Sequence, residues 1–130
     1  FEVGDEDMGK LSASSQDYLE AILELSLQDD KVRSVDIAQK LNVSRASVNK
    51  AIGVLKQAGY IMQERYSDIY LTESGRQAAL DVKERHIALK SFLVNSLGVS
   101  ELTAEKDACK MEHSVSAETL EKLKSFMNEF

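Results

Sequence analysis

The segment Ser34–Tyr60 reads "SVDIAQKLNVSRASVNKAIGVLKQAGY", which is the pattern of two helices joined by a tight turn. Ser34 can cap the start of a short helix in which Val35, Ala38 and Leu41 form an apolar stripe. The next residues, "NVS", interrupt this helical spacing. We therefore predict a short first helix that ends near Leu41.

The second half of the segment predicts a longer helix. Ser44 can cap its start, and Val48, Ile52 and Leu55 recur at the spacing of an inward face. Gly59 is suited to the backbone conformation in which many helices end. A short helix, a turn of about three residues and a longer capped helix are the outline of a helix-turn-helix.

A hairpin is predicted directly after this motif. The segment Tyr60–Thr72, "YIMQERYSDIYLT", has two short stretches rich in Ile and Tyr on either side of Tyr66–Ser67–Asp68. Such a pattern is typical of two antiparallel strands. A hairpin in this position is the wing of a winged-helix domain.

Further helices are expected on both sides. Residues 1–10 are acidic and polar and are expected to be a frayed lead-in. From Ser14, a plausible N-cap, a first helix carries apolar residues at helical spacing: Tyr18, Ile22 and Leu25.

Three more helices are expected after the hairpin. Thr72 can cap a long helix that ends at Gly98, residues 99–116 form another, and Ser116 opens the last. The apolar stripe of the last helix consists of Leu120, Leu123, Met127 and Phe130. We predict a mainly α fold: a winged helix-turn-helix DNA-binding domain over residues 1–74, followed by an all-helical dimerisation domain over residues 75–130.

Composition restricts the class of protein. The chain has 130 residues, of which 43% are hydrophobic and 29% charged, with no proline and one cysteine. It has no apolar run near the roughly 20 residues of a membrane span and begins with no signal-peptide pattern. A single cysteine cannot form an internal disulfide and is compatible with a reducing compartment. We expect a cytoplasmic protein with no membrane partner.

Charge is distributed unevenly along the chain. The net charge is −6, yet residues 31–66 hold seven basic and two acidic side chains. A basic segment on an acidic body is often a nucleic-acid contact face, although a solvated helix face has the same composition.

Candidate DNA contacts lie mainly at the start of the second helix of the motif, which enters the major groove. Lys50 can reach a guanine edge or a phosphate, Asn49 can pair with adenine, and Ala46 can touch a thymine methyl group. Hydroxyls at the amino end of the helix and arginines at its flanks suit phosphate. The candidate set is Arg33, Ser44, Arg45, Ala46, Ser47, Asn49, Lys50 and Arg65.

A second candidate site begins with "CKMEHS", Cys109–Ser114, which holds the only cysteine and one of two histidines. If this segment is helical, Cys109, Glu112 and His113 stand at i, i+3 and i+4 and project from one side. The buried stripe of that helix is predicted to be Ala104, Ala108, Met111 and Val115. Three ligands are too few for a closed metal site, so partners from elsewhere are needed.

Those partners are available. His86 lies on the core side of the long helix, and Asp17 and Glu20, three residues apart, share a side of the first helix. Alone, a buried histidine or cysteine is usually a packing residue, and a helix carboxylate is usually solvated. Together they indicate a metal site. The predicted ligands are Asp17, Glu20, His86, Cys109, Glu112 and His113.

At this point the chain resembles the metal-responsive bacterial repressors typified by the diphtheria toxin repressor and the manganese transport regulator. The resemblance covers roughly residues 14–128. The stretches that carry it are "DYLEAILEL", "VDIAQKLNVSRASVNKAI", "IYLTESGR", "RHIALKSFL" and "CKMEHSVSAETLEKL". It implies the short two-domain form, without the third, SH3-like domain of the iron-type proteins.

The resemblance assigns ligand types. Asp17 and Glu20 match carboxylate ligands of the manganese-type regulators, whereas Cys109 matches the cysteine of the iron-type regulators. His86, Glu112 and His113 match ligands as well. Lys90 and Glu105 stand where the ancillary site of the iron-type proteins has a glutamate and a histidine.

The implied function is a homodimeric repressor of metal-uptake genes that binds a palindromic operator in double-stranded DNA when activated by Mn²⁺ or Fe²⁺. The hybrid ligand set leaves the choice between these two ions open, and Zn²⁺, Co²⁺ or Ni²⁺ are expected to substitute in vitro.

Three alternatives stay open at the level of the sequence. They are a metal-independent winged-helix regulator that responds to a small molecule, a winged-helix protein-interaction module, and a small metalloenzyme. No H-E-x-x-H, P-loop or G-x-G-x-x-G motif is present, so we do not expect an enzyme or an organic substrate.

Overall fold

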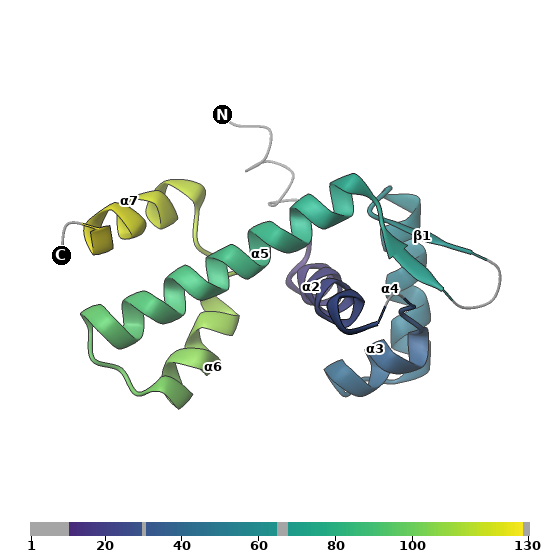
Figure 1. Ribbon diagram of the computed structural model, residues 1–130, viewed down its shortest axis with the longest axis horizontal. Helices are drawn as coiled ribbons and strands as arrows, with labels where there is room; N and C mark the ends of the chain where they lie inside the picture. Colours follow the sequence, from purple (N-terminus) through teal and green to yellow (C-terminus); the bar gives the residue numbers. More distant parts are fainter. Residues whose placement is uncertain (1–10, 30, 65–67, 129–130) are drawn as a thin grey trace. The chain divides into compact units, whose positions relative to one another are not determined.

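The computed structural model describes residues 11–29, 31–64 and 68–128, and these described residues fold into two compact units, 11–80 and 81–128 (Figure 1). The mainly helical architecture, with one small two-stranded sheet, confirms the predicted fold class. The elements in chain order are α2 (Ala13–Gln28), α3 (Ser34–Leu41), α4 (Arg45–Gln57), β1 (Ile61–Gln63), β2 (Ile69–Leu71), α5 (Glu73–Ser91), the π-helical segment η1 (Phe92–Ser96), α6 (Glu101–Met111) and α7 (Ala117–Asn128).

The helix-turn-helix is formed by α3 and α4. Helix α3 ends at Leu41 and is followed by its C-cap Asn42, whose φ of 55° is the left-handed conformation that closes many helices. Ser44 caps α4 as predicted, since its Oγ accepts the backbone N–H of Ser47 at 3.1 Å. The turn between the helices is therefore closed by local backbone and side-chain hydrogen bonds.

Two predicted caps were wrong. Helix α2 is capped by Ser12 instead of Ser14, because Ser12 Oγ accepts the Ser15 N–H at 3.0 Å and the helix starts earlier. Helix α3 is preceded by Arg33, whose backbone N–H donates to Asp36 Oδ2 at 3.1 Å, so Ser34 is already helical.

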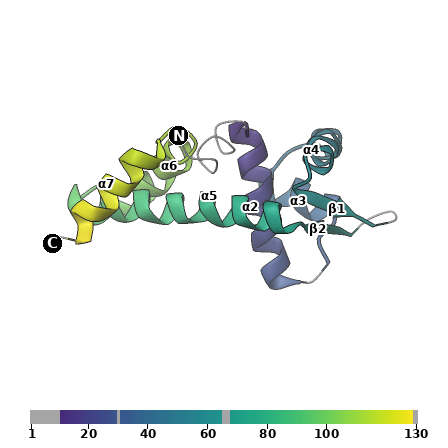
Figure 2. The same cartoon turned by 90° about the horizontal axis from the view of Figure 1, so that it is seen from above.

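The wing is formed by β1 and β2 (Figure 2). The two strands are antiparallel, and Ile61 pairs with Leu71. Val32 adds a bridge to Ile69, whose N–H donates to the Val32 carbonyl at 2.8 Å. The predicted hairpin is confirmed over its strands, and Arg65 in the predicted tip lies outside the described residues.

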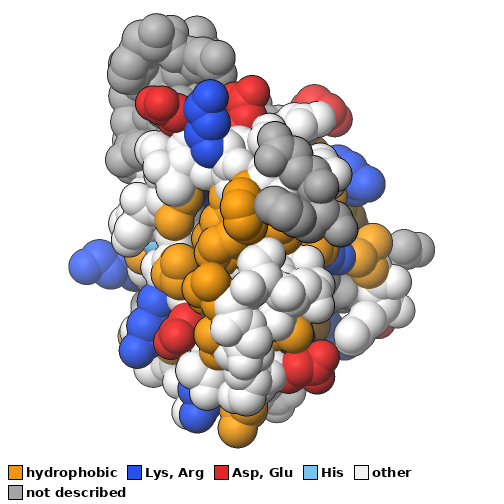
Figure 3. All heavy atoms as spheres, turned by 90° about the vertical axis from the view of Figure 1, so that its left-hand side faces the viewer, with side chains coloured by type: hydrophobic (Ala, Val, Ile, Leu, Met, Phe, Trp, Pro, Cys, Tyr) orange, Lys and Arg blue, Asp and Glu red, His pale blue; other side chains and the backbone are white. Residues whose placement is uncertain are grey.

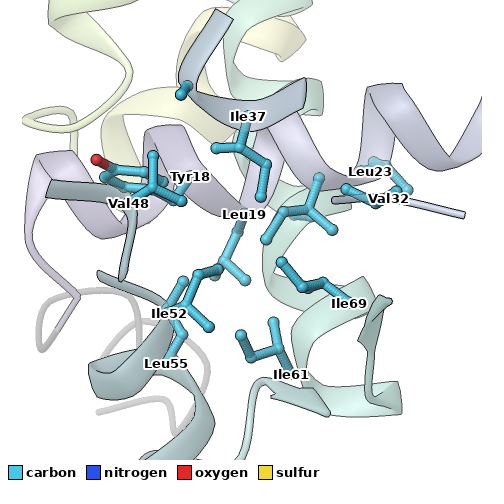
Figure 4. Packing of buried hydrophobic residues seen from close by; sticks show 13 residues of the cluster. Tyr18, Leu19, Leu23, Val32, Ile37, Val48, Ile52, Leu55, Ile61 and Ile69 are labelled. Atoms are coloured by element: carbon cyan, nitrogen blue, oxygen red, sulfur yellow. The ribbon is translucent and has the colours of Figure 1, made fainter. Parts of the chain in front are cut away.

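The core of the N-terminal unit gathers side chains from its helices and both strands (Figure 4). The predicted inward residues of α4 are buried, but the stripe of α3 was partly wrong. Val35 is 36% exposed and Ile37 is 0% exposed, so the buried side of α3 consists of Ile37 and Ala38. The side chains labelled in Figure 4 are Tyr18, Leu19, Leu23, Val32, Ile37, Val48, Ile52, Leu55, Ile61 and Ile69.

The C-terminal unit packs α6 and α7 with the later part of α5 around a smaller cluster: Ala88, Leu89, Ala108 and Leu120. Ser116 caps α7 as predicted, since the Thr119 N–H donates to its Oγ at 3.1 Å. The predicted helix over residues 99–116 was too long: α6 starts after its N-cap Ser100 and ends at Met111. None of the helices in the described ranges is long and apolar enough to cross a membrane.

Candidate metal centre and nucleic-acid interface

The amino-terminal half of α4 presents an uncovered polar face. The predicted contact residues on it, and Arg33 before α3, are all exposed: Ser44, Arg45, Ala46, Ser47, Asn49 and Lys50. Val48, Ile52 and Leu55 anchor the opposite side of the helix in the core. The geometry therefore leaves this face available to a groove, and the individual contacts stay predictions.

Three of the six predicted metal ligands come together in the C-terminal unit. One donor atom from each of His86, Cys109 and Glu112 lies within 4.8 Å of the other two. His86 Nδ1 is 2.8 Å from Glu112 Oε1 and 3.8 Å from Cys109 Sγ. Glu112 is 1% exposed, whereas Cys109 is open to solvent.

The end of α6 positions Glu112. Its backbone N–H still donates to the Ala108 carbonyl at 3.0 Å, so Glu112 is the C-cap and follows Cys109 by about one turn. The helix does not continue to His113, which lies in the following turn and is half-buried.

A buried arginine hydrogen-bonds to this turn. Arg85, 5% exposed, donates from Nη1 to the Glu112 carbonyl at 3.1 Å and also to the Val115 carbonyl. In a continuous helix these two carbonyls would accept backbone N–H groups four residues later. Arg85 thus satisfies two carbonyls just beyond the end of α6, where the buried Glu112 carboxylate lies 2.8 Å from His86 Nδ1.

Arg85 was missed from the sequence, although a signal existed. It stands three residues after Val82 and four before Leu89, both of which are fully buried on α5. A charged residue at that spacing lies on the apolar side of the helix and needs polar partners. Backbone carbonyls at a helix end are suitable partners for a guanidinium.

Glu105 is a second residue that the predicted ligand set did not include. Its Oε2 is 2.5 Å from His86 Nε2, and its Oε1 is 3.2 Å from Lys90 Nζ. The pKa of this carboxyl is lowered: desolvation, the largest single influence, raises the pKa, but Lys90 and His86 together outweigh it.

Asp17 and Glu20 lie on α2 of the N-terminal unit. They stand three residues apart, Asp17 exposed and Glu20 half-buried. The geometry within the C-terminal unit therefore does not involve them, and their role as ligands stays a prediction.

The donor set suits a divalent transition metal. Imidazole and thiolate are ligands of Fe²⁺, Co²⁺ and Zn²⁺, and carboxylate adds an oxygen donor that Mn²⁺ also accepts. A carboxylate that is 1% exposed costs free energy unless a cation or donors compensate it. The residues present therefore fit a bound cation.

Comparison with protein families accounts for both units. Residues 10–69 match the family described as "Iron dependent repressor, N-terminal DNA binding domain". Residues 72–130 match "Iron dependent repressor, metal binding and dimerisation domain".

Relatives cover most of the chain. An HTH-type transcriptional regulator of Methanocaldococcus jannaschii is 38% identical over 92% of this chain and 97% of its own length. The transcriptional regulator MntR of Salmonella typhimurium is also 38% identical, over 85% of this chain and 69% of the relative.

Solved structures are similar in fold. The manganese regulator SloR superposes with a TM-score of 0.79 at 30% identity, over 88% of this chain and 53% of that one. A manganese-dependent transcriptional repressor in complex with manganese gives 0.77 at 32% identity, over 88% and 52%. The chain thus spans about half the length of these two structures.

Proposed function

Since this chain belongs to the family of iron dependent repressors, we propose that it is a transcriptional repressor whose binding to DNA requires a divalent metal ion. The observation that carries the proposal is the cluster of His86, Cys109 and Glu112 in a chain that also has an exposed α4 face. A repressor needs the α4 face to read DNA, and a metal-responsive one needs the cluster. Such a regulator acts in the cytoplasm, on genes for metal uptake.

The proposed ligands are the three clustered residues together with Asp17, Glu20 and His113. Support comes from donor chemistry and from the spacing of the two carboxylates on α2. The proposed activating ion is Mn²⁺ or Fe²⁺, since the set combines hard carboxylates with a thiolate and imidazoles. When bound, the cation would supply the positive charge that compensates the carboxylate and thiolate ligands.

Ligation can affect DNA binding without any ligand touching DNA. Asp17 and Glu20 belong to the unit that contains α4, and the other four ligands belong to the C-terminal unit. A shared cation would restrict the two units to one arrangement and favour the state that binds DNA. The difference in metal-binding free energy between the two states would thus appear as higher affinity for the operator.

The proposed assembly is a homodimer on a palindromic operator, because paired helix-turn-helix units read half-sites about one DNA turn, roughly 34 Å, apart. Leu97, Leu102 and Phe126 of the C-terminal unit are 60%, 70% and 47% exposed, and removal of apolar area from water is favourable. Figure 3 shows hydrophobic side chains gathered on one face. Burial of this apolar surface would favour a dimer.

The decisive experiment is a titration of DNA binding with and without metal. An operator selected from random duplexes in Mn²⁺ is expected to bind the full chain at least about 100-fold more weakly in EDTA, a coupling of roughly 3 kcal/mol. Excess Mn²⁺ or Fe²⁺ should restore the affinity. Sequence-specific binding of equal strength in EDTA would overturn the proposal and favour the metal-independent regulator.

Lys50 provides a test of the DNA-contacting face. Lys50→Ala is expected to weaken operator binding by about 1–3 kcal/mol, because the substitution removes the ammonium group that contacts a guanine edge or a phosphate. Operator affinities measured from 50 to 200 mM salt distinguish a phosphate contact from a guanine contact. Loss of a phosphate contact lowers the slope of log affinity against log salt concentration by about 1.

The matched control is Lys106→Ala, which removes an exposed ammonium group from α6 in the other unit. Its operator affinity should equal that of the wild type. Equal affinities for Lys50→Ala and Lys106→Ala would contradict the assignment of α4 as the DNA-reading helix.

A further inference from the structure

The two ring nitrogens of His86 face different groups. Nδ1 is 2.8 Å from Glu112 Oε1 and 3.8 Å from Cys109 Sγ, so it points into the ligand cluster. Nε2 is 2.5 Å from Glu105 Oε2. The imidazole ring is therefore held between a carboxylate that is 1% exposed and one that is 45% exposed.

Glu105 is itself held in place from α5. Its other oxygen, Oε1, is 3.2 Å from Lys90 Nζ. Lys90 follows His86 by four residues on α5, and Glu105 precedes Cys109 by four residues on α6, so each pair lies on one side of its helix. Lys90 takes one carboxylate oxygen and leaves the other directed at the histidine.

We propose that Glu105, held by Lys90, is the positioning residue that retains the Nε2 proton of His86 and thereby presents Nδ1 to the metal. The inference rests on the proposed function, in which His86 is a ligand. A metal-bound imidazole commonly donates its other N–H to a carboxylate, which fixes the orientation of the ring. If the ring turned over about its Cβ–Cγ bond, Cδ2 and Cε1 would replace Nδ1 and Nε2, and the contacts with Glu112 and Glu105 would both be lost.

The same contacts argue that Glu105 is not a ligand itself. A cation bound to Glu105 would stand beside the Lys90 ammonium group and be repelled by it. The group of donors within 4.8 Å of one another consists of His86, Cys109 and Glu112 and does not contain Glu105. Glu105 Oε2 also accepts a longer contact of 3.8 Å from Cys109 Sγ, so removal of Glu105 should act mainly through its shorter contact with His86 Nε2.

The test uses the full chain loaded with Cd²⁺, a diamagnetic probe, and long-range ¹⁵N–¹H spectra of its histidine rings. The chain has only two histidines, so His113→Gln assigns the signals of His86. In the wild type, cadmium is expected on Nδ1 and the proton on Nε2. Cd²⁺ affinity, measured by calorimetry, should fall about 10–100-fold in Glu105→Ala.

Two companion variants separate positioning from ligation. Glu105→Gln keeps an oxygen that accepts the Nε2–H, so its Cd²⁺ affinity should recover to within about threefold of the wild type. Asp107→Ala removes an exposed carboxylate from the opposite side of α6 and should leave affinity and spectra unchanged. Thermal denaturation of each variant checks that the fold is retained.

Other outcomes overturn the inference. Equal losses in Glu105→Gln and Glu105→Ala, with cadmium on Nε2, would make Glu105 a ligand. Unchanged affinity in Glu105→Ala, with cadmium still on Nδ1 of the wild type, would refute the positioning role and leave the proposed function intact. A wild-type chain that binds no Cd²⁺, Mn²⁺ or Fe²⁺ would refute both.

Discussion

Gly75→Ala is expected to destabilise the unit Leu11–Leu80 by about 3 kcal/mol or more, since overpacking against backbone is costly. A Cβ at this position would lie 1.9 Å from the Tyr60 carbonyl oxygen and 2.8 Å from the carbonyl carbon. Both atoms belong to the main chain, so no side-chain rotation can relieve the clash.

The local hydrogen bonds prevent the helix from moving away. The Thr72 N–H donates to the Tyr60 carbonyl at 3.0 Å, and Thr72 Oγ1 donates to the Gly59 carbonyl at 2.6 Å. Thr72 Oγ1 also accepts the Gly75 N–H at 3.1 Å, which caps α5. A shift of α5 large enough to accommodate the methyl group would break these bonds.

Chemical denaturation, followed by circular dichroism, measures the effect. The matched control is Gly53→Ala, because Gly53 is exposed within α4 and a Cβ there meets no atom within 4 Å. That change should raise the free energy of unfolding by about 0.5–1 kcal/mol, since alanine favours the helix. Effects of the same sign in both variants would contradict the packing seen at Tyr60.

Glu112→Gln is expected to abolish metal-dependent DNA binding. The amide is neutral and nearly isosteric, so the variant removes the buried negative charge from the cluster of His86, Cys109 and Glu112. Loss of a direct ligand should reduce Mn²⁺ affinity by more than the roughly 10–100-fold loss that is typical when a residue hydrogen-bonded to a ligand is removed. Calorimetry with Mn²⁺ measures the loss of metal affinity. Operator binding at a fixed Mn²⁺ concentration measures the loss of DNA affinity.

Stability in EDTA separates ligation from a structural role. A neutral amide costs less to bury than a carboxylate, so the unfolding free energy should fall by no more than about 1 kcal/mol. Asp107→Asn, an exposed position on α6, is the matched control and should retain wild-type metal and operator affinity. A large loss of stability in EDTA, with Mn²⁺ affinity retained, would indicate that Glu112 serves packing alone.

Most of the fold was predictable because its signals are local. The cap at Ser44, the end of α3 near Leu41 and the inward spacing of Val48, Ile52 and Leu55 involve residues only a few positions apart. Propensity, capping and periodicity act over that range. The errors at Ser14 and Ser34 were also local, because several nearby residues can serve as the cap.

The candidate site was predictable as a set of donor types but not as a geometry. The sequence by itself determined which chemical groups are available: two histidines, one cysteine and carboxylates at helical spacing. It could not indicate that Arg85 binds the turn after α6, because Arg85 stands 27 residues before the first carbonyl that it binds.

Tertiary structure alone decided three features. They are the turn that directs Glu112 to His86, the contact of Glu105 with His86 Nε2, and the approach of Gly75 to the Tyr60 carbonyl. Each depends on atoms that lie 15 or more residues apart in the chain and meet only when two elements pack. Helical spacing describes one element at a time, so a contact between elements is settled by packing and by the need to satisfy buried polar groups.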